Sequence, residues 1–333
     1  MNIKDLLLGL AIGDAFGAGV EFQDRNWIRQ HVDFSVFVNV RDQITVAPEQ
    51  KQLFTKNYTA WDYTDDTEMT IGVLKALMSN APFSKTLLIQ KWEEEYNKGL
   101  AEKGYGRNGH GSMSWYFSGE KTIEEIQNFQ RSRHNPGNAP AMRSVPLGLI
   151  DRNLINSYAT INANATHPNA AAIISSQCIA WATEFLVVQK GNPSKVIDYC
   201  LEQIEPNLEY QTYLKQVNLL VNYDKLNHAD FAVLCGHQPI QKPYFLDGIC
   251  GVPSDSKYTA GTVLYILKHS TSPMDALKKS IYIGGDVDSI ASISVGILSS
   301  LFGLDSLPPF MLGNIEGRKY LEEIAQQFEA SLS

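Results

Sequence analysis

Two short acidic clusters lie near opposite ends of this 333-residue chain. The first reads Thr64-Asp65-Asp66-Thr67, and the second reads Gly285-Asp286-Val287-Asp288-Ser289. Carboxylates that converge without a counter-charge repel each other, so a shared site would need a bound cation. If the two clusters form one site, the whole chain between them must fold as one unit. We therefore predict a single domain over residues 1–333.

Helical patterns dominate the rest of the sequence. The segment from Ile3 to about Phe16 is apolar on nearly every side, which is typical of a helix buried on several faces. Gly9, Gly13 and Gly17 recur at four-residue spacing, so in a helix they form a smooth stripe that another backbone can approach closely. Further helices are expected at about 67–78, 84–97, 123–130, 168–189, 193–203, 208–221, 259–268, 273–281 and 288–302.

Strand-like alternation is scarce. A short strand is expected only at 34–40, within a long connection over 23–63 that joins the first helix to the first acidic cluster. Connections of this length inside compact domains are usually functional or mobile. The sequence therefore predicts an all-α fold.

Composition and charge exclude several classes of protein. Hydrophobic residues make up 44% of the chain and charged residues 19%, which is enough apolar material for a sizeable core. A net charge of -8 gives no general electrostatic reason to bind nucleic acid or an anionic membrane, so neither is expected as a partner. The four cysteines show no CxxC spacing and indicate reduced thiols, hence a cytoplasmic protein.

Two apolar segments resemble targeting or membrane sequences and need separate treatment. The run 6–12 is flanked by Asp5 and Asp14, which are unusual beside a secretory signal. The run 170–188 approaches membrane-spanning length, but Gln177 and Glu184 interrupt it. We predict that both runs are buried core helices.

Each acidic cluster has two interpretations. Hydroxyl and carboxyl side chains at a helix start are ordinary capping signals, and this explanation suffices for either cluster alone. Together, however, four carboxylates with hydroxyl oxygens form a hard ligand set that suits Mg²⁺, Mn²⁺ or Ca²⁺ and not zinc. Gly284 and Gly285 precede the carboxylates of the second cluster and permit an irregular turn that aims them at one point.

Five segments of the chain then resemble the ADP-ribosylglycohydrolase family, in that family's order and across nearly the whole length. They are LLLGLAIGDAFGAGVEF (6–22), YTDDTEMT (63–70), GNAPAMRSVPLGL (137–149), THPNAA (166–171) and GGDVDSIASISVGIL (284–298). The resemblance implies a compact orthogonal multi-helix domain with a central cleft that holds two Mg²⁺ or Mn²⁺ ions. It places the metal ligands at Thr64, Asp65, Asp66, Asp286, Asp288 and Ser289.

The resemblance also implies catalytic and substrate-binding residues. Glu21 matches an acidic residue that lies beside the reactive ribose in several family members, and the candidates for proton transfer are Glu21, Asp65 and Asp66. Ser289 stands where family members usually have threonine, and it keeps the hydroxyl. The expected substrate-binding residues are Gly109, Gly111, Ser112, Gly137, Asn138, Ala139 and His167.

Some of these assignments have structural alternatives. The Gly-rich run 104–112 is either a pyrophosphate cradle or a flexible turn, and Asn138 is either a ligand contact or a helix cap. His167, before Pro168 at an expected helix start, is either a ligand contact or a structural histidine. Arg143 is either a phosphate contact or a buried ion-pair partner, so we do not include it in the site.

The expected activity is removal of mono-ADP-ribose from a modified protein side chain, with arginine as first choice and serine as second. An ADP-ribosylating toxin or transferase is a compatible counterpart. The alternatives are a catalytically silent relative that binds ADP-ribose or a partner, and a hydrolase of another small ribosyl N-glycoside. The presence of all the expected carboxylates and hydroxyls argues against the silent relative.

Overall fold

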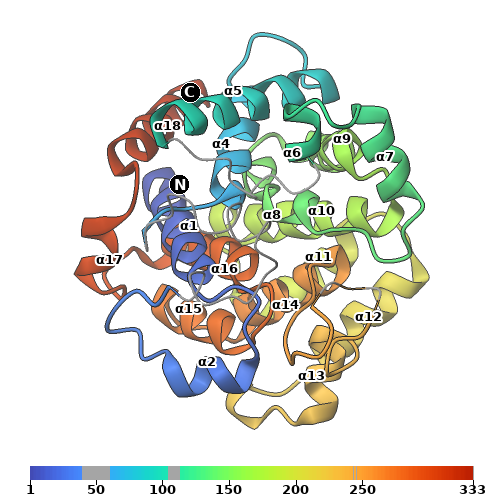
Figure 1. The fold of residues 1–333 in the computed structure, drawn as a ribbon, viewed down its shortest axis with the longest axis vertical. Helices are drawn as coiled ribbons and strands as arrows, with labels where there is room; N and C mark the ends of the chain where they lie inside the picture. Colours follow the sequence, from blue (N-terminus) through green and yellow to red (C-terminus); the bar gives the residue numbers. More distant parts are fainter. Residues whose placement is uncertain (40–60, 104–112, 243, 245, 333) are drawn as a thin grey trace.

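Two apolar helices from opposite ends of the sequence lie side by side at the centre of the structure (Figure 1). In this computed structural model, which describes residues 1–39, 61–103, 113–242, 244 and 246–332, they are α1 (Ile3–Ala18) and α16 (Val287–Phe302). The glycine stripe of α1 faces α16, and a Cβ added at Gly13 would lie 2.3 Å from the carbonyl oxygen of Ala291. Only glycine permits this approach, so the predicted packing role of the stripe is confirmed.

Further helices surround this central pair. The other α-helices are α2 (Arg25–His31), α4 (Asp65–Leu77), α5 (Lys85–Lys103), α6 (Met113–Phe117), α7 (Ile123–Arg131), α8 (Ala139–Met142), α9 (Ile155–Thr166), α10 (Ala170–Thr183), α11 (Val196–Gln203), α12 (Leu208–Asn218), α13 (His228–Cys235), α14 (Ser256–His269), α15 (Pro273–Tyr282), α17 (Pro309–Asn314) and α18 (Arg318–Ser331). Short 3₁₀ segments are η2 (Val145–Gly148), η3 (Arg152–Leu154), η5 (Pro193–Lys195) and η6 (Tyr223–Lys225), and η4 (Glu184–Val188) is a π-helix. The described residues contain no strand, only isolated bridges, so the all-α prediction is confirmed.

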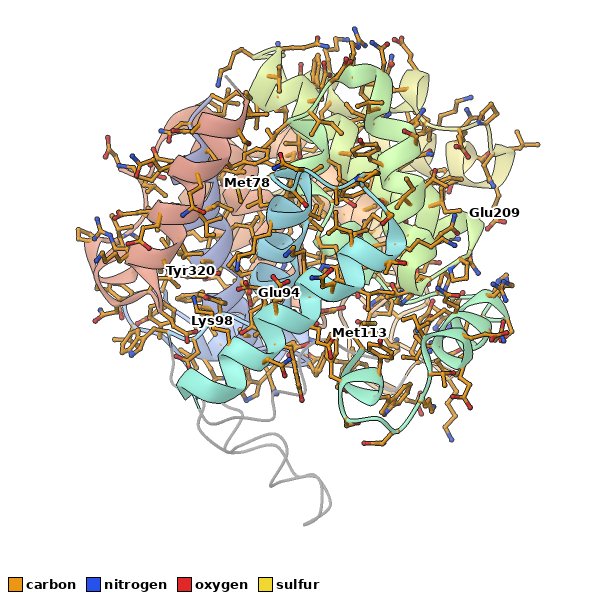
Figure 2. All side chains as sticks on the ribbon, turned by 90° about the horizontal axis from the view of Figure 1, so that it is seen from above. Met78, Glu94, Lys98, Met113, Glu209 and Tyr320 are labelled. Atoms are coloured by element: carbon orange, nitrogen blue, oxygen red, sulfur yellow. The ribbon has the colours of Figure 1, made fainter. Side chains whose placement is uncertain are left out.

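Helix α4, which begins at the first acidic cluster, is held by α5 and α18. Lys75 of α4 pairs with Glu95 of α5, and the Tyr320 hydroxyl of α18 donates to Glu95 Oε2 at 2.9 Å. Figure 2 shows Lys98 of α5 beside Tyr320, with its ammonium 3.2 Å from the ring centroid. The Trp92 indole N–H also donates to the Met69 carbonyl at 3.1 Å. These contacts between three helices fix the direction in which α4 presents its N-terminus.

The second membrane-like segment is a core helix, as predicted. Residues Ala170–Val188 are long and apolar enough to cross a membrane, and the core helix of a soluble protein passes the same test. In the structure 78% of that apolar window is buried, and α10 packs against α8, α9 and α14. The first apolar run, 6–12, is likewise buried within α1.

Several local predictions were wrong. The expected strand at 34–40 is absent over 34–39, where the chain bends at 34–36 and has no regular structure at 37–39, because Phe34 has a left-handed φ of 63° that no regular strand accommodates. Helix α10 starts at Ala170 instead of Pro168, since Asn169 accepts from the backbone N–H of Ala171 and caps it. Helices α9 and α18 were not predicted, although Leu321, Ile324, Ala325 and Phe328 of α18 are buried at helical spacing.

We expect Gly13→Ala to lower the free energy of unfolding by about 1–3 kcal/mol, because the added methyl group would overlap the backbone of α16. Gly313→Ala is the matched control, since nothing lies within 4 Å of a Cβ at that position and alanine is the better helix former. Urea denaturation of both variants measures the difference. Equal stability of the two variants would contradict the close approach of α1 and α16.

Candidate metal and substrate site

An acidic side chain within the apolar helix α1 fixes the start of α4. The buried Asp14 carboxylate accepts from the backbone N–H groups of Thr64 and Thr67 at 2.9 and 3.0 Å, and from their hydroxyls at 2.7 and 2.6 Å. Unpaired N–H groups at a helix start, together with the helix dipole, favour a negative charge there. Asp14 therefore caps α4 from another helix and determines where Asp65 and Asp66 lie.

The first cluster is not an ordinary helix cap. Thr64 occupies the N-cap position of α4, but its side chain accepts no capping hydrogen bond and donates instead to Asp14. Asp66 is buried, and among the described residues its Oδ1 has no hydrogen-bond partner, which is costly for a carboxylate oxygen. Asp65, the first residue of the helix, is half-buried.

Two glycines form the turn that presents the second cluster. Gly284 and Gly285 have φ values of 76° and 81°, a region that favours glycine. Two other chain segments hold this turn. The Gly285 N–H donates to the Gln23 carbonyl at 2.9 Å, and the Asp286 N–H donates to the Val252 carbonyl at 2.9 Å. Asp286 stands at the N-cap position of α16 without a side-chain capping bond, so capping does not explain this cluster either.

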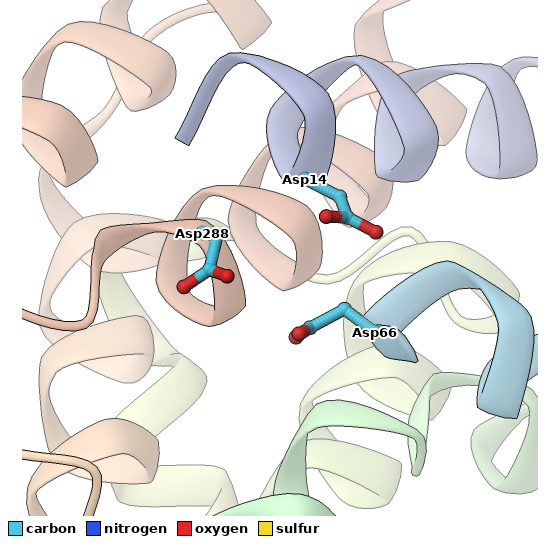
Figure 3. Close-up of side chains that lie close together, drawn as sticks. All are labelled: Asp14, Asp66 and Asp288. Carbon is cyan, nitrogen blue, oxygen red and sulfur yellow. The ribbon is translucent and has the colours of Figure 1, made fainter. Parts of the chain in front are cut away.

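Carboxylates from the two clusters converge between α1, α4 and α16 (Figure 3). Oxygens of Asp14, Asp66 and Asp288 lie within 4.8 Å of one another, and so do oxygens of Glu21, Asp286 and Asp288. Asp288 belongs to both groups, so the groups adjoin each other. The structure thus brings together acidic side chains from opposite ends of the sequence.

This convergence raises the pKa values of the buried acids. Burial, together with the negative charges of Asp14, Asp65 and Asp286, holds the pKa of Asp66 well above its usual range. Burial and the charges of Glu21, Asp286 and Asp66 do the same to the pKa of Asp288. A hydrogen bond with Ser289 lowers the pKa of Asp66 but does not outweigh these effects. Without a counter-charge, Asp66 and Asp288 therefore bind protons more readily than free carboxylates do.

The residues fit a hard divalent cation. Each acidic group offers only carboxylate oxygens, the Thr64 and Ser289 hydroxyls stand next to them in the sequence, and neither group contains a histidine or cysteine. Oxygen ligands of this kind suit Mg²⁺ or Mn²⁺ better than zinc. A cation would neutralise the converging charges and give Asp66 Oδ1 a partner. Asp14 Oδ2 already accepts three hydrogen bonds, so Asp14 is better suited to positioning Thr64 than to binding metal.

Asn138 joins the second cluster to a separate part of the chain. It occupies the N-cap position of α8 without a capping bond, and its amide donates to Asp286 Oδ2 at 2.9 Å and to Ser289 Oγ at 3.1 Å. The Ser254 hydroxyl also donates to Asp286 Oδ2. Capping is therefore wrong for Asn138, which instead orients a carboxylate and a hydroxyl of the site.

The other described substrate-binding candidates lie beside Asn138. A Cβ added at Gly137 would be 3.0 Å from Nε2 of His167, so these two residues face each other, and Ala139 begins α8. His167 is buried at the end of α9, and burial lowers its pKa well below the usual range. Gly109, Gly111 and Ser112 lie outside the described residues.

Arg143 is a buried structural residue, as one of its two alternatives predicted, but its partners are not the expected acid. Its guanidinium is fully buried and donates to Asn162 Oδ1 at 2.8 Å and to Thr166 Oγ1 at 2.8 Å. Its Cζ lies 3.8 Å from the centroid of the Trp92 ring. Among the described residues, Arg143 is therefore held by uncharged side chains and not by an ion pair, and it does not face solvent as a phosphate contact would.

Comparison with known proteins identifies the family. The ADP-ribosylglycohydrolase model matches residues 2–332. The chain belongs to this family.

Relatives and a solved structure agree with this assignment. The chain is 21% identical to ADP-ribosylhydrolase ARH3 of Bos taurus, over 98% of this chain and 91% of that protein. It is 20% identical to ADP-ribosylarginine hydrolase Tri1 of Pseudomonas putida, over 97% of this chain and 76% of that protein. A solved structure described as an ADP-ribosylglycohydrolase-related protein complex has the same fold, with a TM-score of 0.62, 17% identity, and coverage of 100% of this chain and 99% of that chain.

Two residues of this ADP-ribosylglycohydrolase site were not predicted. Asp14 carries a visible signal, because an acid inside a helix that is apolar on all sides must be paired or functional. Ser254 carries none, since its contact with Asp286 depends on how the 250–255 segment passes the Gly285 turn. The first residue could have been found from the sequence, whereas the second needs the tertiary structure.

In the metal-free protein, we expect the free energy of unfolding of Asp66→Asn to increase relative to that of wild type as the pH rises. The folded pKa of Asp66 is raised, so the folded state binds more protons than the unfolded state between about pH 4 and that raised pKa. The stabilising contribution of the Asp66 carboxyl group is present below the pKa of the unfolded state and is lost as the pH rises through the pKa of the folded state. Asparagine removes this loss.

Urea denaturation in chelator across a pH series measures this difference, with the exposed Asp305→Asn as the matched control. As the pH rises, the free energy of unfolding of Asp66→Asn should increase relative to that of wild type. The free energy of unfolding of Asp305→Asn should change with pH as that of wild type does. The raised pKa of Asp66 would be contradicted if the difference in free energy of unfolding between Asp66→Asn and wild type did not vary with pH, or if wild type gained stability relative to the variant as the pH rose.

Proposed function

We propose that this chain is a metal-dependent hydrolase that removes ADP-ribose from modified protein side chains. ADP-ribosyl-arginine is the first choice of linkage, in line with the name of the relative ADP-ribosylarginine hydrolase Tri1, and ADP-ribosyl-serine is the second. The observation that carries the proposal is the convergence of buried carboxylates from α1, α4 and α16 on one oxygen-lined site. Family membership over residues 2–332 supports the same reaction class.

The reaction would break the bond between the anomeric carbon of a ribose and the protein side chain. Such cleavage passes through an oxocarbenium-like state and needs a positioned water and a protonated leaving group. The ions would be held by Thr64, Asp65, Asp66, Asp286, Asp288 and Ser289. Two bound Mg²⁺ or Mn²⁺ ions would supply Lewis-acid charge for the ribose hydroxyls and for the attacking water.

The chain's own carboxylates would move the protons. Glu21 adjoins Asp286 and Asp288 and is half-buried, so it can exchange protons with a substrate at the edge of the site. Asp65 is half-buried as well, whereas Asp66 is almost wholly buried. We therefore propose Glu21 or Asp65 as the group that takes the proton of the water or protonates the leaving group.

The polar residues beside the site would hold the rest of the ligand. Asn138 and Ser254 keep the Asp286 carboxylate in one orientation, which a positioned ribose requires. Gly137 lets the backbone come close to His167, and both are placed to contact ADP-ribose. We propose that the Gly109–Ser112 segment contributes backbone N–H groups to the pyrophosphate.

We also propose a cytoplasmic location and a modified protein as the substrate. Three of the four cysteines are buried free thiols, which fits a reducing compartment. The counterpart enzyme would be an ADP-ribosylating toxin or transferase, because only such an enzyme produces the proposed substrate.

We expect release of free ADP-ribose from arginine-linked substrate in Mg²⁺ or Mn²⁺, and none in chelator. Asp66→Asn and Asp288→Asn should each lower kcat/KM by more than about a hundredfold, because each removes a ligand of the proposed cation site. Asp305→Asn, an exposed acid away from the site, should keep full activity. Chromatography of the released nucleotide gives the rates.

Parallel reactions with serine-linked substrate and with small ribosyl N-glycosides separate the alternatives. Faster release from serine would reverse the order of linkages. Turnover of small N-glycosides alone would exclude the protein substrate. Binding of ADP-ribose without any turnover would indicate a silent relative, and full activity of both aspartate variants would exclude the metal site.

A further inference from the structure

We propose that Arg143 and Thr166 are positioning residues that hold His167 in the tautomer with its proton on Nε2, so that the Nε2–H group is a ready hydrogen-bond donor to ADP-ribose. The identity of the ligand, ADP-ribose, rests on the proposed function. The tautomer rests only on the hydrogen bonds between these three side chains, and it can be tested without any ligand.

The chain of hydrogen bonds begins at the buried guanidinium of Arg143. Asn162 accepts from it through both Oδ1, at 2.8 Å from Nε, and its carbonyl oxygen, at 3.1 Å from Nη2. Nη2 also donates to Thr166 Oγ1 at 2.8 Å. Stacking on Trp92 covers the guanidinium plane, with Cζ 3.8 Å from the ring centroid. These contacts fix the guanidinium within the core.

The direction of the next hydrogen bond follows from what each group can do. A guanidinium only donates, so Thr166 Oγ1 must accept from Arg143. Thr166 Oγ1 has a second lone pair, so the direction depends on its own proton: among the described residues the acceptor within reach is Nδ1 of His167, at 2.7 Å, and if Nδ1 donated instead, the buried hydroxyl proton would lack a partner. Nδ1 therefore accepts, and a neutral imidazole that accepts at Nδ1 carries its proton on Nε2.

The charges around His167 favour the neutral ring. Burial and the positive charges of Arg143 and Arg133 lower the pKa of His167 well below its usual range. An imidazolium would also need to donate from Nδ1, where Thr166 already points its own proton. The same arginine thus disfavours the charged ring and selects one of the two neutral tautomers.

The Nε2 side of the ring faces the predicted substrate segment. A Cβ added at Gly137 would lie 3.0 Å from Nε2, and the next residue, Asn138, donates to Asp286 and Ser289. Nε2 therefore lies beside Gly137, the residue that precedes Asn138 in the sequence, and Asn138 itself contacts the acidic site. Arg143 also contacts Met69 of α4 through Nη1, with 3.7 Å to the sulfur, so it links the His167 side to the helix of Asp65 and Asp66.

The tautomer is tested first, by ¹⁵N NMR of protein labelled at histidine. Loss of a signal in His167→Gln assigns the ring, and wild type should show a protonated Nε2 and an unprotonated Nδ1. Thr166→Val removes the relay with little change in volume and should give a mixture of tautomers, whereas Thr166→Ser should restore the wild-type pattern.

Thr160→Val is the matched control, because Thr160 lies on the same helix and its hydroxyl donates to the Asn156 carbonyl instead. It should leave the His167 signals unchanged. A wild-type ring protonated on Nδ1, or an unchanged tautomer in Thr166→Val, would overturn the relay.

Calorimetry with ADP-ribose then tests the donor role. Thr166→Val should weaken binding about tenfold, the cost of one misdirected hydrogen bond, and Thr166→Ser should restore it. Unchanged affinity in Thr166→Val would overturn the donor role. A wild-type protein with the Nε2–H tautomer that binds no ADP-ribose would instead overturn the proposed function, with the relay itself supported.

Discussion

The contact of the α1 glycine stripe with the backbone of α16 determines the rest of the structure. It brings residues from the two ends of the chain to within van der Waals distance, with Gly17 directly over the Cα of Asp288. Asp14 follows Gly13 on α1, and it reaches across to cap α4 through Thr64 and Thr67. One helix pair therefore places three acidic side chains from three helices around a common point.

This arrangement concentrates charge in the core, and the surrounding fold compensates for it. Burial and the neighbouring negative charges raise the pKa values of Asp66 and Asp288, so their ionised forms are disfavoured unless a cation is present. The extensive burial of apolar side chains in α1 and α16 offsets the cost of this charged centre. Cation binding and stability are thus coupled, because a cation that binds only the folded protein also stabilises it.

The polar residues around the centre form a second, uncharged layer. Asn138 and Ser254 restrain Asp286, and the Arg143–Thr166 pair restrains His167. Both sets lie at the boundary between the acidic site and the segment that the family resemblance assigns to substrate. The geometry therefore separates two tasks, since carboxylates would hold cations while neutral donors would contact the ligand.

Much of the fold and of the acidic site could be predicted from the sequence. The two acidic clusters, the glycine stripe and the glycine pair at Gly284 and Gly285 each carry a physical signal that does not depend on distant contacts. Asp14 could have been found as an acid inside an apolar helix, but its capping role could not, because the contact with the start of α4 depends on the tertiary structure. The strand at 34–40 was wrong because the left-handed conformation of Phe34 is set by its packing against Phe16 and Tyr282, with ring centroids 5.2 Å apart in each pair.

The partners of Arg143 could not be predicted for a related reason. Its charge suggested a charged partner, whereas the fold supplies Asn162, Thr166 and the Trp92 ring from helices far apart in the sequence. No pattern within the 137–149 motif indicates these partners. Residue type and spacing identify which side chains matter, and tertiary packing decides what each one touches.

Anomalous diffraction from a crystal grown with Mn²⁺ tests the central claim most directly. If the two ends of the chain form one cation site, the manganese peak must lie at coordination distance, about 2.1–2.3 Å, from carboxylate oxygens of both Asp66 and Asp288. A peak coordinated by only one of the two clusters, or manganese bound elsewhere on the protein, would contradict it.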